Sequence, residues 1–138
     1  AQAQNGYQAC LGCAEHVELQ QTWHRPFLLE LVTESVLIAS HFAVEVQARR
    51  DGLCETNIFL RGPALPGGCH PFSLTRALLI ATPLELLVFT SPAWALARAG
   101  HPKLGLVLEA VPMTLHALAI GHTLAAIHSY QREQAVYH

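Results

Sequence analysis

Charged side chains are scarce in this chain. Only 13% of its 138 residues are Asp, Glu, Lys or Arg, about half the share usual in soluble globular proteins. A soluble domain of this size has a large surface for its volume and needs polar side chains to cover it. The scarcity of charge therefore argues against a free-standing soluble domain. The formal net charge of -2 argues against nucleic acid as a partner, because domains that bind it usually carry a basic patch.

Three long apolar runs occupy much of the chain. Each has about 20 residues, which is the length that an α-helix needs to cross a hydrocarbon core of roughly 30 Å. Prolines lie inside the runs at Pro83, Pro92 and Pro112, and membrane helices accept proline more readily than helices in water. The sequence thus predicts an all-α integral membrane protein with three transmembrane helices. Their expected bounds are 27–48, 77–97 and 104–128.

Proline, glycine and charge mark the ends of these runs. The segment "RRDG" (49–52) ends the first run, and "GPALPGG" (62–68) is too rich in Pro and Gly to be regular. The segment "RAGHPKLG" (98–105) predicts a tight break between the second and third helices. We therefore expect a polar N-terminal segment over 1–25, a three-helix membrane domain over 26–132 and a tail over 133–138.

A soluble helical bundle is the alternative interpretation. Four ionisable residues of the first run share one helical face, which is typical of the wet side of an amphipathic helix. The second run, however, contains only Glu85 as an ionisable residue, and the third contains Glu109 and otherwise histidines. Helices that are apolar on nearly all sides must be buried in something, which favours the membrane. The face on the first run is formed by Glu30, Glu34, His41 and Glu45.

The N-terminus and the basic residues predict an orientation. The opening "AQAQNGYQ" resembles the polar start that signal peptidase leaves, and a truncated chain is the alternative. With the N-terminus outside, five basic residues face the cytoplasm and three face outward, which is a modest positive-inside bias. We expect a bacterial inner-membrane protein with an extracytoplasmic N-terminus and a cleaved signal peptide. The five are Arg49, Arg50, Arg61, Arg76 and Arg132, and the three are Arg25, Arg98 and Lys103.

Four cysteines form two local pairs. Cys10 and Cys13 lie in "CLGC", three residues before His16. This spacing predicts a short-loop disulfide between the two cysteines, with free thiols or a metal site of Cys10, Cys13 and His16 as alternatives. Cys54 and Cys69 bracket the Pro/Gly segment, and a disulfide between them requires an oxidising compartment. The expected orientation places this segment in the cytoplasm, so the two expectations conflict.

Ionisable residues inside the runs predict a buried polar seam. A Glu or His side chain that faces lipid is costly, so such residues turn toward the interior of a helical bundle and find partners. Glu34 and His41 are seven residues apart in the first run, and Glu109 and His116 have the same spacing in the third. Each pair therefore shares one helical face. The expected seam carboxylates are Glu30, Glu34, Glu45 and Glu109.

Such a seam supports several kinds of chemistry. Proton relay, metal binding and axial ligation of a tetrapyrrole all use histidine nitrogens, whereas the plainest role is hydrogen bonding between helices. His116 is the first candidate for a cofactor ligand, with His122 and His41 after it; the sequence does not identify a cofactor, and haem or chlorophyll is the candidate. His116, His122 and His128 step by about 240° around a helix and cannot bind one ion together. Gly121 would let a helix or a flat cofactor approach closely.

Two segments resemble those of a group of small bacterial membrane proteins. In these proteins an apolar helix with a polar patch precedes a G-x-x-E-x-N-P loop. "ASHFAVEVQARRDGLCETNIFLRG" matches at Gly52, Glu55 and Asn57 and has Ile58 where proline is usual. "RAGHPKLGLVLEAVPMTLHALAIGHTLAAIHS" is similar to their last helix, with its H-x-x-A-x-x-H-like spacing. The resemblance implies about three membrane helices and no particular activity.

Together these features predict a small non-catalytic accessory subunit of a larger membrane complex, respiratory or photosynthetic. Its partners would be other membrane subunits and the lipid bilayer. One alternative is a three-helix protein that holds haem or chlorophyll through His116 and His41. A second alternative is a metal- or thiol-active protein that works through Cys10, Cys13 and His16.

Overall fold

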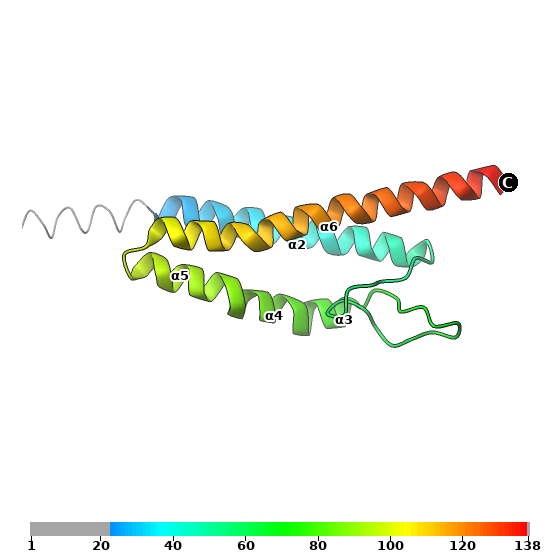
Figure 1. Ribbon diagram of the computed structural model, residues 1–138, viewed down its shortest axis with the longest axis horizontal. Helices are drawn as coiled ribbons and strands as arrows, with labels where there is room; N and C mark the ends of the chain where they lie inside the picture. The colour runs from blue at the N-terminus through cyan, green and yellow to red at the C-terminus, as the bar shows by residue number, and fades with distance from the viewer. Residues whose placement is uncertain (1–22, 138) are drawn as a thin grey trace, which may run out of the picture.

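The computed structural model describes residues 23–137, and this part of the chain is all-helical apart from one long loop (Figure 1). Its three long helices are α2 (His24–Arg50), a composite helix over Leu74–Arg98, and α6 (Pro102–Tyr137). Each is long and apolar enough to cross a membrane. The predicted all-α fold with three membrane-spanning helices is therefore confirmed.

The composite helix contains two π-helical turns. In chain order it consists of α3 (Leu74–Arg76), η1 (Ala77–Ala81), α4 (Thr82–Glu85), η2 (Leu86–Thr90) and α5 (Ser91–Arg98), where η1 and η2 are the π turns. Each π turn comes just before a proline, Pro83 or Pro92. A proline ring crowds the carbonyl four residues earlier and offers that carbonyl no N–H. The wider π turn makes room for the ring without breaking the helix.

Small residues bring α5 and α6 together. Ala93 and Ala97 are fully buried, and they face Gly105 near the start of α6. Such close contacts let helices pack in lipid, where no hydrophobic force drives them together. Helix α6 also packs along α2, whereas α3, η1 and α4 make few contacts with either of these helices. The loop-side half of the composite helix is thus the more loosely packed part of the bundle (Figure 1).

Two apolar clusters close the bundle at its two ends. Near the short connection between α5 and α6, the first cluster contains Trp23, Phe27, Ala93 and Ala97. At the loop end, the second contains Phe42, Leu60, Phe72 and Ala77. Many large apolar side chains lie on the outside of the helices, where lipid would cover them. Among the most exposed are Leu29, Leu79, Leu87, Val107 and Leu118.

The loop between α2 and α3 is held by its own bonds. After Asp51 caps α2, Gly52 adopts a φ of 83° and its N–H donates to the Arg49 carbonyl, a helix ending that glycine favours. A disulfide joins Cys54 and Cys69. Two arginines at the helix ends donate to loop carbonyls, Arg49 to Phe72 and Arg76 to Ile58. The loop is therefore an ordered cover over one end of the bundle.

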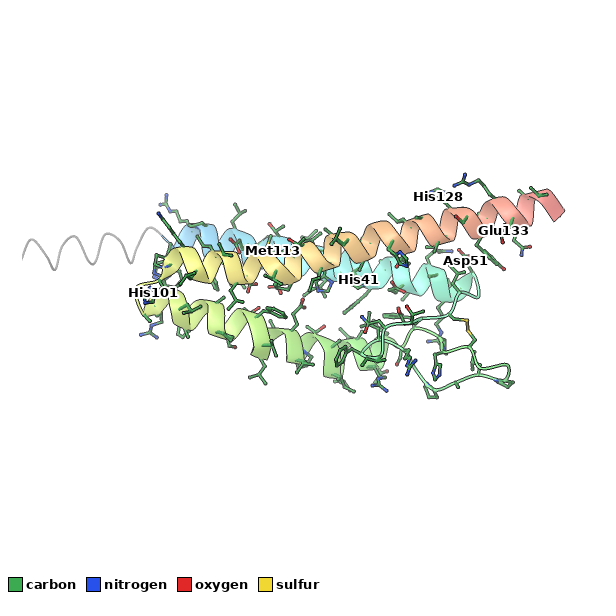
Figure 2. The ribbon with its side chains drawn as sticks, in the orientation of Figure 1. His41, Asp51, His101, Met113, His128 and Glu133 are labelled. Atoms are coloured by element: carbon green, nitrogen blue, oxygen red, sulfur yellow. A yellow bond between two sulfur atoms is a disulfide. The ribbon has the colours of Figure 1, made fainter. Side chains whose placement is uncertain are left out.

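The third helix is longer than predicted. It was expected to end near residue 128 and to be followed by a tail over 133–138, yet α6 continues to Tyr137. Hydropathy marks only the part of a helix that lies in lipid, and residues 129–137 contain no Gly or Pro that would end it. With 36 residues, α6 is about 54 Å long. Its last turns, which carry Glu133, extend past the end of α2 (Figure 2).

The α5–α6 contact predicts a difference between two glycines of α6. A methyl group on Gly105 would collide with the Ala93 carbonyl oxygen, whereas one on Gly121 would meet nothing within 4 Å. Gly105→Ala should therefore lower the free energy of unfolding by about 1–3 kcal/mol. Gly121→Ala should leave it unchanged or raise it by up to about 1 kcal/mol, because alanine favours helix. Denaturation of the detergent-solubilised protein measures both, and equal effects would contradict the assigned contact.

Candidate functional site

Polar side chains fill the bundle between the two apolar clusters. Glu34, His41, Glu45 and Glu109 are all buried, and Glu109 has no exposed surface. Burying an ionised carboxylate is costly unless it is paired and hydrogen-bonded. The contacts that these groups make with each other are therefore the main determinant of how the helices face one another.

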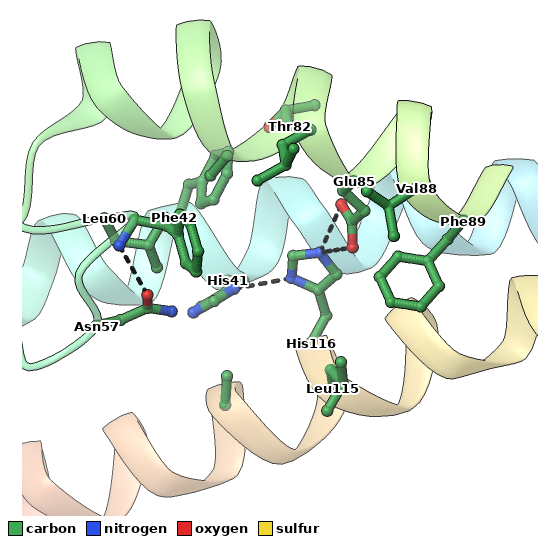
Figure 3. A pocket seen from close by; sticks show the side chains of 14 residues that line it. His41, Phe42, Asn57, Leu60, Thr82, Glu85, Val88, Phe89, Leu115 and His116 are labelled. Atoms are coloured by element: carbon green, nitrogen blue, oxygen red, sulfur yellow. Dashed lines mark hydrogen bonds and ion pairs between the residues drawn. The ribbon is translucent and has the colours of Figure 1, made fainter. Parts of the chain in front are cut away.

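Two histidines meet at the centre of the bundle. The Nδ1 atoms of His41, on α2, and His116, on α6, lie 2.8 Å apart (Figure 3). The rings are nearly perpendicular, with an interplanar angle of 68° and centroids 5.0 Å apart. At this distance one nitrogen must carry a hydrogen and the other must accept it. The pair is thus a hydrogen bond that joins two membrane helices.

A carboxylate faces the outer nitrogen of each ring. His116 Nε2 lies 2.8 and 3.0 Å from the two oxygens of Glu85, on α4. His41 Nε2 lies 3.5 Å from Glu45 Oε1, and this oxygen also accepts a hydrogen bond of 2.6 Å from the Thr123 hydroxyl. We call Glu85, His116, His41 and Glu45 the polar row. It links the three long helices in one line.

The polar row has two hydrogen-bonded links, Glu85–His116 and His116–His41, and a longer contact of 3.5 Å between His41 and Glu45. Two neutral imidazoles supply the two hydrogens that the bonded links need. A third proton on His41 or Glu45 would supply a hydrogen for the longer contact as well. Hydrogens could then shift from one link to the next without movement of any helix. This is the arrangement that proton transfer along a row of histidine and carboxyl groups requires.

A second polar group lies deeper, toward the α5–α6 connection. The Thr90 hydroxyl lies 3.5 Å from Glu34 Oε2 and 3.3 Å from Glu109 Oε1. A hydroxyl has one hydrogen and can donate to only one carboxyl group at a time. For both contacts to be hydrogen bonds, the other carboxyl group must be protonated and donate to Thr90. We call Glu34 and Glu109, which meet at Thr90, the carboxyl pair.

Electrostatic interactions between carboxyl groups connect the polar row with the carboxyl pair. Glu85 of the polar row lies close enough to Glu34 to interact with it electrostatically, and Glu109 interacts in the same way with Glu30. Glu85 lies between the two π turns, and Thr90 ends the second of them. Such turns often occur at functional sites. Here the π turns lie next to Glu85 and Thr90, the two residues of the composite helix that contact the polar side chains of the other helices.

Glu55 extends the polar row to the loop surface. Burial raises the pKa of its carboxyl group to about 7, and a hydrogen bond to Glu45 adds to this effect. The Asn57 N–H donates to Glu55 Oε1 at 2.8 Å and acts in the opposite direction. Glu55 is only partly buried. It therefore provides a group that exchanges protons with water near neutral pH and contacts the row.

A cavity of about 330 Å³ lies beside the polar row. Its polar lining consists of His41, His116 and Glu85 from the helices, with Thr82 and with Asn57 from the loop. The remaining lining is apolar: Phe42, Phe59, Leu60, Ala81, Leu84, Val88, Phe89, Leu115 and Ala119. The cavity occupies the loosely packed part of the bundle that the divergence of α3 and α4 creates.

The structure brings together five of the seven described residues that the sequence singled out. His41 and His116 are in contact, Glu45 joins them, and Glu34 and Glu109 meet at Thr90. Glu30 is only partly buried, and His122 is exposed on α6, away from the others. Cys10, Cys13 and His16 lie outside the described residues. Sequence reasoning did not assign a role to Glu85, although an ionisable residue in a membrane helix is itself a signal of function.

Metal and cofactor binding have limited support in the described residues. Between residues 23 and 137, no three His, Cys, Asp or Glu side chains are placed to hold one metal ion. Both nitrogens of His116 are engaged, by Glu85 and by His41. Axial ligation of a tetrapyrrole by His116 would therefore require the polar row to break, and the haem or chlorophyll site remains a prediction.

Comparison with protein-family models, with curated proteins and with solved structures finds no match. The resemblance to small bacterial membrane proteins remains a prediction. The class of protein that the fold defines is a three-helix membrane protein with a polar interior.

The raised pKa of Glu55 predicts a pH-dependent stability. The folded protein holds this proton up to about pH 7, whereas an ordinary glutamate loses it near 4.5. The folded state thus binds more protons in this interval, so the free energy of unfolding should fall as the pH rises from about 4.5 to about 7. Glu55→Gln should remove this part of the decline.

Thermal unfolding of the detergent-solubilised protein between pH 5 and pH 8 measures the effect. Glu133→Gln changes an exposed carboxyl group near the end of α6 and is the matched control. A pH profile of Glu55→Gln that matched the wild-type profile would contradict the role of Glu55.

Proposed function

We propose that this protein conducts protons through its interior, from the loop end of the bundle toward the α5–α6 connection. The observation that carries the proposal is the polar row, in which His41 and His116 are in direct contact and each faces a carboxylate. Ionisable residues are rare in membrane helices and are typical of proton relays in pumps and transporters. A structural seam would need partners for its polar groups, but not a continuous line of them.

The titratable groups form an ordered series along the bundle. From the loop inward they are Glu55, Glu45, His41, His116, Glu85, the carboxyl pair Glu34 and Glu109, and Glu30. Glu55 takes protons from water. The two histidines pass them on, because each ring can accept on one nitrogen while it donates from the other. The carboxyl groups beyond Glu85 continue the path toward the opposite side.

Proton flux into liposomes tests this function. Purified protein is reconstituted with a pH-sensitive dye inside the vesicles, and a potassium gradient with valinomycin drives proton entry. His116→Leu should reduce the flux to that of protein-free vesicles, because the row loses its central link. His122→Leu, an exposed position six residues further along the same helix, should leave the flux unchanged. Wild-type flux no faster than that of protein-free vesicles would overturn the proposal.

The orientation of the chain is part of the proposal. A disulfide persists in an oxidising compartment, so the Cys54–Cys69 bond favours a loop that faces outward. The positive-inside count favours the reverse, but Arg49 and Arg76 bond to the loop itself and so have a structural use. We therefore favour an orientation in which the loop faces outward and the N-terminal segment lies on the cytoplasmic side of a bacterial inner membrane. This is the opposite of the orientation expected from charge.

Labelling of whole cells distinguishes the two orientations. After treatment with a reductant, a membrane-impermeant maleimide should label Cys54 and Cys69 and should leave Cys10 and Cys13 unlabelled. A Cys54→Ser/Cys69→Ser variant serves as the control for the assignment. The reverse pattern, with Cys10 and Cys13 labelled from outside, would restore the orientation predicted from charge.

Membership of a larger complex is a second candidate function. The observation that favours it is the C-terminal part of α6, which extends past the bundle and has exposed side chains at its surface. A helix end that has no neighbours among residues 23–137 offers a surface to another subunit. Gentle detergent extraction followed by native mass measurement separates a single chain from an assembly, and a single chain would remove this candidate.

A further inference from the structure

The cavity beside the polar row has the properties of a small-molecule site. Its volume of about 330 Å³ falls at the lower end of the range for ligand pockets, roughly 300–1,000 Å³. Such pockets are mostly apolar, with a few polar groups that orient the ligand. Nine of the lining residues are apolar, and the polar ones include the His116–Glu85 pair. The ligand that fits is therefore largely apolar and carries a few hydrogen-bonding atoms.

The cavity opens toward lipid. Leu84, Val88 and Leu115 line it and are also exposed on the outside of their helices, by 40%, 49% and 55%. All three lie within helices that are apolar enough to cross a membrane. A ligand can therefore enter sideways between α4–η2 and α6, from the hydrocarbon phase. This favours a lipid-soluble molecule over a water-soluble one.

The lining also indicates the shape of the ligand. Phe42, Phe59 and Phe89 contribute aromatic rings from α2, the loop and η2, and aromatic rings pack well against another flat ring. Both nitrogens of His116 are engaged, but the Glu85 oxygens that bond to it (Figure 3) keep lone pairs that can accept from a ligand hydroxyl. Asn57 uses its side-chain oxygen for the Phe59 N–H at 3.0 Å, which leaves its amide hydrogens for a ligand oxygen. An acyl chain would use none of these polar groups.

We propose that this cavity binds a lipid-soluble ring with oxygen substituents, of the quinone or hydroquinone class. A ring oxygen accepts from the Asn57 amide, a ring hydroxyl of the hydroquinone form donates to Glu85, and the apolar tail leaves the cavity between Leu84 and Leu115 into the bilayer. The ligand shares Glu85 with the proposed proton path, but its binding does not require protons to cross the membrane. The two proposals can therefore fail separately.

Equilibrium binding to the full chain in lipid nanodiscs tests the site. The probe is a radiolabelled decyl-benzoquinone, and its partition into empty nanodiscs of the same lipid is subtracted. Saturable binding by the wild-type protein supports the proposal, and its absence overturns it. Decylbenzene, which has the same tail and no oxygens, should bind at least about tenfold more weakly, because buried polar groups discriminate against a ligand that leaves them unpaired. Equal affinity would overturn the assignment of a ring with oxygens.

Two alanines of α6 provide matched variants. Ala119 lines the cavity, whereas Ala117 is exposed on the outside of the same helix. Ala119→Phe fills the cavity and should weaken binding of the benzoquinone by at least about tenfold, since a packed site has no room for a second ring. Ala117→Phe should change it less than about twofold. Unchanged binding by Ala119→Phe would overturn the location of the site.

Ala119→Leu is the smaller variant for the case in which Ala119→Phe does not fold, and it should also weaken binding. Proton flux in liposomes is measured on the same preparations. Binding by a wild-type protein without flux would overturn the proposed proton path and leave the ligand site intact. Flux without binding would do the reverse.

Discussion

The hydrogen bond between His41 and His116 is the contact on which the rest of the interior depends. In lipid a polar side chain cannot form hydrogen bonds with water, so its partner must lie inside the bundle. Joining these two rings fixes the faces that α2 and α6 present to each other. The seven-residue spacing then carries Glu34 and Glu109 to the same side of the interior, where Thr90 of the composite helix meets both. One contact between two helices thereby sets the place of the second polar group and of the third helix.

The composite helix shows how packing and polarity are balanced. At one end, Ala93 and Ala97 let α6 approach closely at Gly105, and the bundle is tight. At the other end, two prolines and two π turns let the helix diverge while it stays continuous. Glu85, between these turns, still reaches His116, so the hydrogen bond bridges a gap that apolar side chains do not fill. The cavity is the consequence: the same geometry that brings a carboxylate to the ring leaves space beside it.

The sequence predicted the three helices because each apolar run is long and contains few charged residues, and length and hydropathy are local properties. It also indicated His41, His116 and Glu109 as interior residues, because their spacing on a helix is local too. Glu85 was not assigned a role, since its place depends on the π turns, which no simple period reveals. The approach of Cys54 to Cys69 follows from the fold of the whole loop. The count of basic residues had placed this loop in the cytoplasm, where a disulfide is not expected. The length of α6 was underestimated because hydropathy reports the lipid-covered part of a helix and is silent where the helix continues into water.

The two ends of the polar series differ in their access to water. At the loop end, Glu55 is partly exposed and near its titration midpoint at neutral pH, so the polar row exchanges protons with the adjacent water. At the opposite end, Trp23, Phe27, Ala93 and Ala97 close the bundle, and Glu30 is the last carboxyl group of the series among the described residues. In the proposed path, protons would therefore reach the His41–His116 pair from the loop side first. Since the cavity lies beside this pair, a ring bound there would share the access to water on the loop side. The disulfide-held loop then acts on ligand binding and on proton exchange at once, because Asn57, Phe59 and Leu60 line the cavity while Glu55, in the same loop, contacts the row.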